Sequence, residues 1–207
     1  MNLAVFASGR GSNFEAILRA IHGGQLPATV RLAVSNKSTA GALEIARAHQ
    51  IPAFHRAPSQ YPSAEAYVED LTGLLREHRV EFIALAGYLK QVPAEVVRQF
   101  RNRIANIHPA LLPAFGGKGM YGIHVHEAVL AAGVKLSGAT VHLVDEEYDR
   151  GPIVLQRVVD VLPGDTPESL AARVLEVEHV MYPEALAAFA EGRVRMEGRC
   201  VWIQPRR

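Results

Sequence analysis

Several features are scarce or balanced in this 207-residue sequence, and each excludes a class of protein. Cysteine occurs once, as Cys200, which excludes an internal disulfide framework and favours a reducing compartment. Neither sign of charge dominates, because 22 Lys and Arg residues stand against 21 Asp and Glu residues. We therefore expect no polybasic surface and no nucleic-acid partner, so an anionic ligand would have to be bound by a local group of residues.

Long apolar runs are missing as well. The N-terminal stretch MNLAVFASGRGSN reaches glycine-rich polar residues too early for a signal-peptide core or a membrane span. We expect no membrane partner and a cytoplasmic location. With 49% hydrophobic and 21% charged residues, the composition is that of a folded globular protein, and 207 residues suffice for one domain.

Apolar strands and amphipathic helices alternate in the first half of this predicted domain, about residues 1–100. Runs of strand length occupy 2–7, 29–35 and 82–87. Segments with apolar residues at helical spacing lie between them, around 14–21, 40–49 and 67–75. This alternation predicts an α/β fold with a mostly parallel sheet that helices cover on both faces.

The second half, about residues 101–207, adds strands and a long helix. Strands are expected at 103–108, 138–144 and 152–162, with a short helix near 126–132. The long helix is predicted to run from Pro167 to about Ala190, with Thr166 as its N-cap and proline at its first position. A small hairpin is expected to turn at Glu197 and Gly198.

The stretch SGRGSN, residues 8–13, connects the first predicted strand to the first predicted helix. Free backbone N–H groups and the helix dipole favour an anion at such a position, and a monophosphate fits it. A dinucleotide fingerprint would need glycine where Phe14 stands, and no P-loop motif is present. A purely structural interpretation stays open, in which the glycines make a tight turn and Ser12 with Glu15 forms a capping box.

The stretch NIHPALLP places Asn106 and His108 two residues apart between hydrophobic residues. If the strand persists, both side chains point to one face. An imidazole can move a proton and an amide can donate to a developing oxyanion, which together suit acyl transfer. The acidic loop DEEYDRG, residues 145–151, offers a carboxylate to orient the imidazole. The alternatives are a core histidine and a solvated acidic turn.

The nine histidines raise the possibility of a metal site. The spacing does not favour one, because the pair at 124 and 126 lacks the i, i+4 arrangement of a zinc protease and no second cysteine exists. We expect no metal. A serine nucleophile elbow, G-x-S-x-G, is also missing.

Stretches spread along the chain together resemble the phosphoribosylglycinamide formyltransferase family, the folate-dependent formyltransferases of purine biosynthesis, also called GAR transformylases. They are SGRGSN, LAGYLK, NIHPALLPAF, GATVHLVDEEYDRGPIVLQ and EHVMYP, in the family's order. The motif N-x-H-P-x-L-L-P marks the wider superfamily, and the G-x-G-S-N loop narrows it. The resemblance implies a three-layer formyltransferase-type fold, with a Rossmann-like N-terminal half and with added strands and a long helix in the C-terminal half.

The resemblance also implies a role for each matching residue. The catalytic trio is matched by Asn106, His108 and Asp149. The site of glycinamide ribonucleotide is matched by Gly11, Ser12 and Asn13 at its phosphate and by Glu178 near its amine. The folate site is matched by Leu89, Lys90, Gln91, Val92, Asn106, Asp145, Glu146, Glu147, Tyr148 and Asp149. The implied reaction is direct transfer of a formyl group from 10-formyltetrahydrofolate, a co-substrate, to that amine, with no metal.

The sequence departs from the family at three places. Ala64 and Lys90 stand where many members carry arginine near the folate, and the loop at 116–122 is longer than in the shortest members. A transfer-RNA formyltransferase or a formyltetrahydrofolate hydrolase would be expected to carry a further domain. A non-catalytic module that binds a phosphoribosyl group or a nucleotide is the alternative from another class. A monomer or a homodimer is expected.

Overall fold

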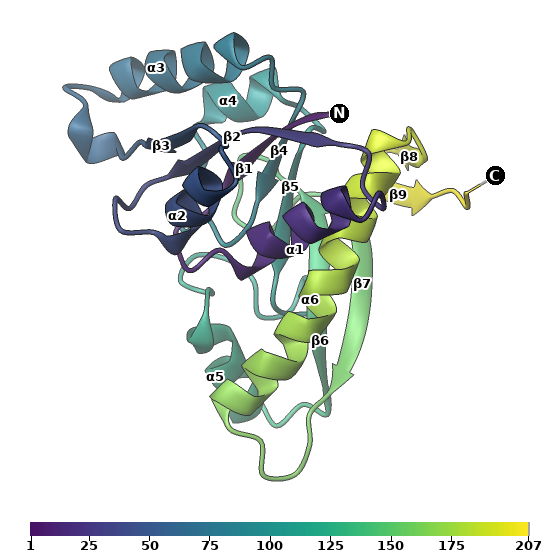
Figure 1. The fold of residues 1–207 in the computed structure, drawn as a ribbon. Helices are drawn as coiled ribbons and strands as arrows, with labels where there is room; N and C mark the ends of the chain where they lie inside the picture. The colour runs from purple at the N-terminus through teal and green to yellow at the C-terminus, as the bar shows by residue number, and fades with distance from the viewer. Residues whose placement is uncertain (207) are drawn as a thin grey trace. The chain divides into compact units, whose positions relative to one another are not determined.

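The computed structural model describes residues 1–206. The chain forms two compact units, Met1–Asn106 and a second unit from Ile107 onward. Figure 1 shows both units in ribbon form, coloured by residue number. Among residues 1–206, no helix combines the length and the apolar composition needed to cross a membrane.

Parallel strands form the centre of the first unit, and they confirm the predicted α/β fold. The strands are β1 (Asn2–Phe6), β2 (Thr29–Ser35), β3 (Ala53–His55), β4 (Phe82–Leu85) and β5 (Ile104–His108). Their order is β3-β2-β1-β4-β5 and every neighbouring pair is parallel. The predicted strands match in position, but β3 has only three residues, too few for a periodic pattern.

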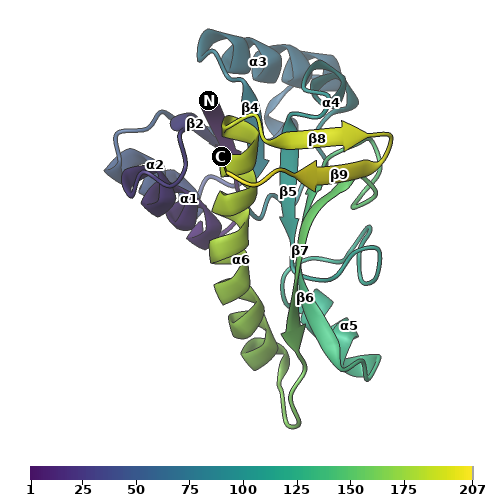
Figure 2. The ribbon, with the colours of Figure 1, turned by 90° about the vertical axis from the view of Figure 1, so that its right-hand side faces the viewer.

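Helices cover both faces of these strands, as the alternating pattern predicted. Figures 1 and 2 show α1 (Ser12–His22) and α2 (Gly41–Ala48) together on one face, and α3 (Ala64–Glu77) and α4 (Ala94–Gln99) on the other. Right-handed crossovers require this division, because the chain moves one way from β1 to β3 and the other way from β3 to β5. The one-turn 3₁₀ helix η1 (Pro58–Gln60) precedes α3.

The start of α1 differs from the capping box that was one interpretation of SGRGSN. Helix α1 begins at Ser12 itself, and Gly11 is its N-cap with a left-handed backbone at φ 92° and no side-chain cap. Ser12 is therefore one position too late to cap the helix, and the capping-box interpretation is wrong.

The second unit combines an antiparallel strand pair with a long helix. Strands β6 (Leu136–Leu143) and β7 (Ile153–Asp160) pair antiparallel, and Figure 2 shows α6 (Pro167–Ala190) running along them. The unit also contains α5 (Ile123–Ala131) and the hairpin of β8 (Val194–Glu197) and β9 (Cys200–Ile203).

The predicted ends and cap of α6 are confirmed. The helix starts at Pro167 and ends at Ala190, and the Thr166 hydroxyl accepts a hydrogen bond from the Ser169 N–H at 3.2 Å. The Ser169 hydroxyl in turn accepts from the Thr166 N–H at 2.9 Å. These reciprocal bonds satisfy two of the donors that every helix start leaves free.

The order in which strands are added to the sheet reverses between β1 and β4, which are parallel neighbours. From β1 the chain proceeds to β2 on one side, and β4 lies on the other side. Ligands of open parallel sheets bind beyond the carboxyl ends of the strands at such a reversal. A ligand-binding site is therefore expected at the loops that follow β1 and β4, residues 7–11 and 86–93.

Candidate active site

The loop after β1 is held closely against α2. A Cβ atom added to Gly11 would lie 2.7 Å from Cδ1 of Ile45 and 2.9 Å from Cα of Ala42, so only glycine fits there. Ser12 is half-buried and Asn13 is buried at the first turn of α1. Backbone N–H groups of a helix start favour an anion, so the geometry suits the phosphate predicted for this loop.

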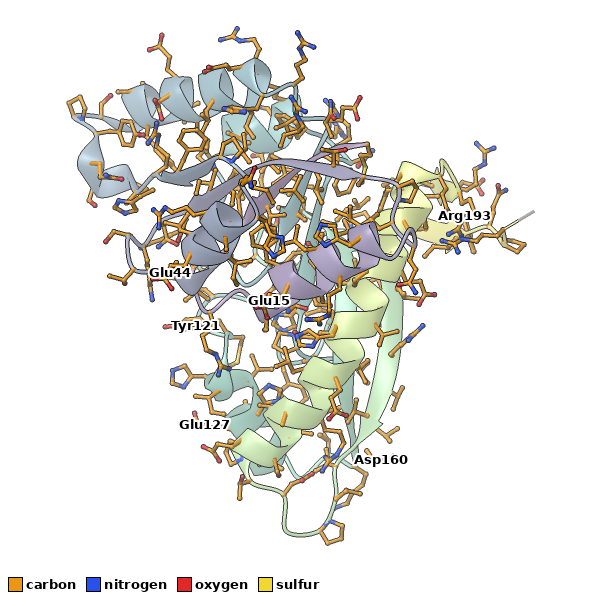
Figure 3. All side chains as sticks on the ribbon, viewed as in Figure 1. Glu15, Glu44, Tyr121, Glu127, Asp160 and Arg193 are labelled. Carbon is orange, nitrogen blue, oxygen red and sulfur yellow. The ribbon has the colours of Figure 1, made fainter. Side chains whose placement is uncertain are left out.

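The acidic residues near these two helix starts belong to the outer surface. Figure 3 shows Glu15 on α1 and Glu44 on α2, and both are exposed to solvent. Each lies in the first turn of its helix, where a carboxylate interacts favourably with the helix dipole.

The segment Leu89–Val92 follows β4 and is only partly available to a ligand. Leu89 and the two residues after it are exposed, whereas Val92 is buried. The N–H of Leu89 already donates to the hydroxyl of Ser8 at 2.8 Å. Tyr88, just before the segment, packs edge-on against Phe6 with ring centroids 5.4 Å apart.

Strand β5 carries Asn106 and His108, as predicted. The strand persists through both residues, so their side chains lie on one face. His108 is 4% exposed, and its Nε2 lies 2.9 Å from the carbonyl oxygen of Phe115. Because a carbonyl oxygen can only accept, this nitrogen carries the proton and the other ring nitrogen, Nδ1, is left to face its neighbours.

Asp149 is that neighbour. Its Oδ2 lies 3.7 Å from Nδ1 of His108 and accepts the Gly117 N–H at 2.8 Å, and its Oδ1 lies 3.4 Å from Nε2 of His142. The side chain is 12% exposed. The carboxylate therefore lies between two buried histidines, and a backbone amide fixes its orientation.

The other residues of the acidic loop do not share this burial. Glu146, Glu147 and Tyr148 are exposed, and Asp145 accepts the Glu147 N–H at 3.0 Å within the loop itself. The interpretation as a solvated acidic turn thus holds for these residues in the structure, while Asp149 alone turns inward. Its left-handed backbone, φ 54°, produces this change of direction.

Burial and charge act in opposite directions on this pair. Burial lowers the pKa of His108 below its ordinary 6.5 and outweighs Asp149 and the Phe115 carbonyl, which raise that pKa. Burial alone would raise the pKa of the Asp149 carboxyl, but the surrounding histidines and amide outweigh it and hold that pKa below 3.8. Asp149 thus raises the pKa of His108, but burial lowers that pKa by more.

Comparison with known proteins places this chain in a family. The family model described as formyl transferase matches residues 1–186. The chain belongs to the formyl transferase family. The resemblance predicted from the motifs is thereby confirmed, together with the α/β fold that it implied.

Similar proteins carry a more specific name. Phosphoribosylglycinamide formyltransferase of Escherichia coli (strain K12) is 36% identical over 207 residues, covering 100% of this chain and 95% of that protein. The chloroplastic phosphoribosylglycinamide formyltransferase of Arabidopsis thaliana is 50% identical over 93% of this chain, but the chain spans only 66% of its length. A crystal structure of glycinamide ribonucleotide transformylase 1 from Symbiobacterium toebii has a TM-score of 0.92 and 42% identity, covering 99% of this chain and 94% of that chain.

Two further histidines of this formyl transferase lie close to His108 and Asp149. In the sequence, they were considered only as possible metal ligands. His142 of β6 is buried against Asp149, and it is a polar residue inside an apolar strand, the same signal that identified His108. His126 of α5 is buried, and its Nδ1 has no hydrogen-bond partner within residues 1–206. Burial, and after it the charge of His108, lowers the pKa of His126. The imidazoles of both residues therefore lie near the pair formed by His108 and Asp149.

His124 is different, because its Nδ1 pairs with Glu127 at 3.0 Å on the exposed side of α5, where Figure 3 shows Glu127. Within residues 1–206, no group of three or more His, Cys, Asp or Glu side chains is placed to hold a metal ion.

Glu178 lies on α6 and is 6% exposed. Burial removes this carboxylate from bulk water, and its position is the one that the family resemblance places near the amine of the substrate.

Proposed function

We propose that the chain transfers the formyl group of 10-formyltetrahydrofolate to the amine of 5'-phosphoribosylglycinamide in purine biosynthesis. The single observation that carries the proposal is the buried His108 with Asp149 3.7 Å from its Nδ1, on the strand that also carries Asn106. The names of the relatives support the choice of substrates. Formyl transfer requires a proton carrier and an oxyanion donor, and these side chains can supply both.

The proposed reaction needs no further reactant. The substrate amine attacks the formyl carbon, and the formyl oxygen becomes an oxyanion. The side-chain amide N–H of Asn106 donates a hydrogen bond to this oxyanion. The bond from the formyl carbon to the folate nitrogen then breaks. The amine loses one proton and the folate nitrogen gains one, and His108 transfers the proton from the first nitrogen to the second. Asp149 stabilises the imidazolium that exists between these two steps.

Binding of the substrates is assigned to the residues that match the family. We propose that Gly11, Ser12 and Asn13 bind the phosphate at the start of α1, and that Glu178 binds the amine. Leu89 to Val92 and the loop from Asp145 to Asp149 would contact the folate. The Leu89 N–H is already bonded to Ser8, so it is not among the groups proposed to contact the folate. Ala64 and Lys90 leave fewer planar cations for the folate tail than a pair of arginines would.

The experiment is an assay of formyl transfer from 10-formyltetrahydrofolate to glycinamide ribonucleotide, with both products quantified. Replacing His108 by Ala should lower kcat by about 10²- to 10⁴-fold, and Asn106→Ala by about 10²- to 10³-fold. The matched control is His124→Ala, because that histidine is exposed and its contacts are with Glu127 and with the ring of Tyr121 on the outer side of α5. Its rate should stay within about twofold of the wild-type rate.

Other results would point elsewhere. Release of formate without formylated product would indicate a hydrolase, and binding of the ribonucleotide without any turnover would indicate a binding module. Full activity in the His108 variant would contradict the catalytic assignment. Independence from metal, a cytoplasmic location and an assembly of one or two chains stay predictions; activity in the presence of a chelator tests the first.

A further inference from the structure

The ends of three neighbouring strands meet around one serine in the first unit. Phe6 at the end of β1 is paired with Val34 of β2 on one side and with Leu85 of β4 on the other. The ladder continues beyond the strands, because the Ser8 N–H donates to the Gly87 carbonyl oxygen at 3.0 Å. Ser8 therefore lies at the carboxyl ends of these parallel strands, at the point where the strand order of the sheet reverses.

The Ser8 hydroxyl connects the loops on both sides. It is buried, donates to Oδ1 of Asn36 after β2, and accepts the backbone N–H of Leu89 after β4 at 2.8 Å. A serine hydroxyl has one proton to donate and lone pairs to accept with, so the two contacts use it in both capacities. One oxygen atom thus joins the loop that leads to Gly11 with the segment that begins at Leu89.

We propose that Ser8 is a positioning residue that couples the two substrates: when one loop is occupied by its ligand, the Ser8 hydroxyl holds the other loop ready for its own ligand. The inference rests on the proposed function, which assigns the phosphate to the loop of Ser8 and the folate to the segment of Leu89. Ser8 itself touches neither ligand in this assignment.

The physical basis is the entropy of ordering a loop. A ligand that reduces the remaining motion of the first loop also restricts Ser8, and through the hydrogen bond it restricts the backbone of Leu89. The second ligand then has less ordering left to do, which appears as tighter binding. Because one hydrogen bond carries this effect, the expected coupling is about two- to tenfold in Kd, and it must be equal in both directions.

The experiment measures the Kd of tetrahydrofolate by calorimetry on the full chain, without and with saturating glycinamide ribonucleotide. Tetrahydrofolate has no formyl group, so no transfer occurs during the measurement. The variants are Ser8→Ala and a matched control, Ser35→Ala. Ser35 is also a buried serine at the end of a neighbouring strand, and its hydroxyl accepts the Lys37 N–H at 3.1 Å within its own loop.

The wild-type protein and Ser35→Ala should show tetrahydrofolate binding about two- to tenfold more tightly when the ribonucleotide is present, and Ser8→Ala should show a ratio near one. A wild-type ratio of one, an unchanged ratio in Ser8→Ala, or an equal loss in Ser35→Ala would overturn the inference. Failure of the wild-type chain to bind either ligand would overturn the proposed function itself, and the inference with it.

A second measurement covers the case in which Ser8→Ala does not fold. Hydrogen exchange of the Leu89 amide in the wild-type chain should slow when the ribonucleotide alone is added, because its acceptor becomes fixed. This slowing of exchange at Leu89 should be weaker in Asn36→Ala. That variant keeps the Ser8 hydroxyl but removes the Asn36 oxygen to which the hydroxyl donates. No slowing at Leu89 in the wild-type chain would contradict the coupling.

Discussion

Opposite physical effects act on His108, and burial is the largest of them. Its burial favours the neutral ring, while the Asp149 carboxylate and the Phe115 carbonyl favour the charged one. A neutral ring that donates from Nε2 to Phe115 leaves a lone pair on Nδ1 facing Asp149, which is unfavourable. A proton on Nδ1 would remove that repulsion, so the site is suited to holding a proton briefly.

We predict that Asp149→Asn lowers the pKa of His108 further, because burial then acts with less opposition. Turnover should fall by more than about tenfold, while the Kd of the ribonucleotide stays within about twofold. NMR titration of the His108 ring and steady-state kinetics measure the two effects. Asp145→Asn, in the same loop, is the matched control for the titration and should leave the midpoint of His108 unchanged. An unchanged titration midpoint in Asp149→Asn would contradict the role of the carboxylate.

At the scale of elements, the turn from β1 into α1 depends on one glycine. Gly11 combines a left-handed backbone with contacts under 3 Å between an added Cβ and both Ala42 and Ile45. We predict that Gly11→Ala destabilises the chain by more than about 1–2 kcal/mol, the backbone cost alone, and also weakens ribonucleotide binding. Urea unfolding and calorimetry give the two numbers.

Gly9 provides the comparison within the same loop. Nothing lies within 4 Å of a Cβ added there, so Gly9→Ala should change stability by less than about 0.5 kcal/mol. Equal effects of the two substitutions would show that the contacts with α2 do not matter.

The cap of α6 gives a prediction about stability alone. Thr166→Ala removes the acceptor for the Ser169 N–H and should lower the free energy of unfolding by about 1 kcal/mol. Ser63→Ala removes the corresponding cap of α3, whose hydroxyl accepts the Ala66 N–H at 3.2 Å, and should have a similar effect. Urea denaturation measures both. Neither change should alter kcat, and a loss of activity in the folded Thr166→Ala protein would show that the cap does more than stabilise.

At the scale of the whole molecule, the buried titratable groups predict acid sensitivity. The pKa values of His108 and His126 are lowered in the folded state, so below about pH 6.5 the unfolded chain binds protons that the folded chain does not. Stability therefore falls as pH decreases from 6.5, by up to about 1.4 kcal/mol per pH unit for each histidine. Asp149, whose pKa is also lowered, extends the loss below its ordinary value of 3.8.

Two histidines of α5 test this dependence. His126→Asn removes one buried group and should reduce the slope of stability against pH between about 6.5 and 5, whereas His124→Asn, on the exposed side, should not. Urea unfolding at a series of pH values gives the slopes. A slope unchanged by His126→Asn would mean that this group titrates alike in both states.

Much of the fold followed from local patterns. The apolar runs that became β1, β2, β4 and β5, the start and end of α6, and its Thr166 cap all depend on neighbours within a few residues, and these could be predicted. The elements β3, α4 and η1 were not predicted, because three to six residues are too few to show a period in the spacing of apolar residues. Ser12 was wrongly considered as a cap because the left-handed backbone of Gly11 is not visible in the sequence.

The sequence by itself determined the α/β fold and the family, because residue types and their spacing encode these, and it supplied the residues proposed to carry a proton and to bind a phosphate. Only the tertiary structure decided that Asp149 alone turns inward from the acidic loop, that His142 contacts it, and that the Ser8 hydroxyl joins two loops. Each of these depends on distances between residues far apart in the chain. The pKa of His108 belongs with them, because burial is a property of the packed molecule and outweighed the carboxylate that the sequence had identified.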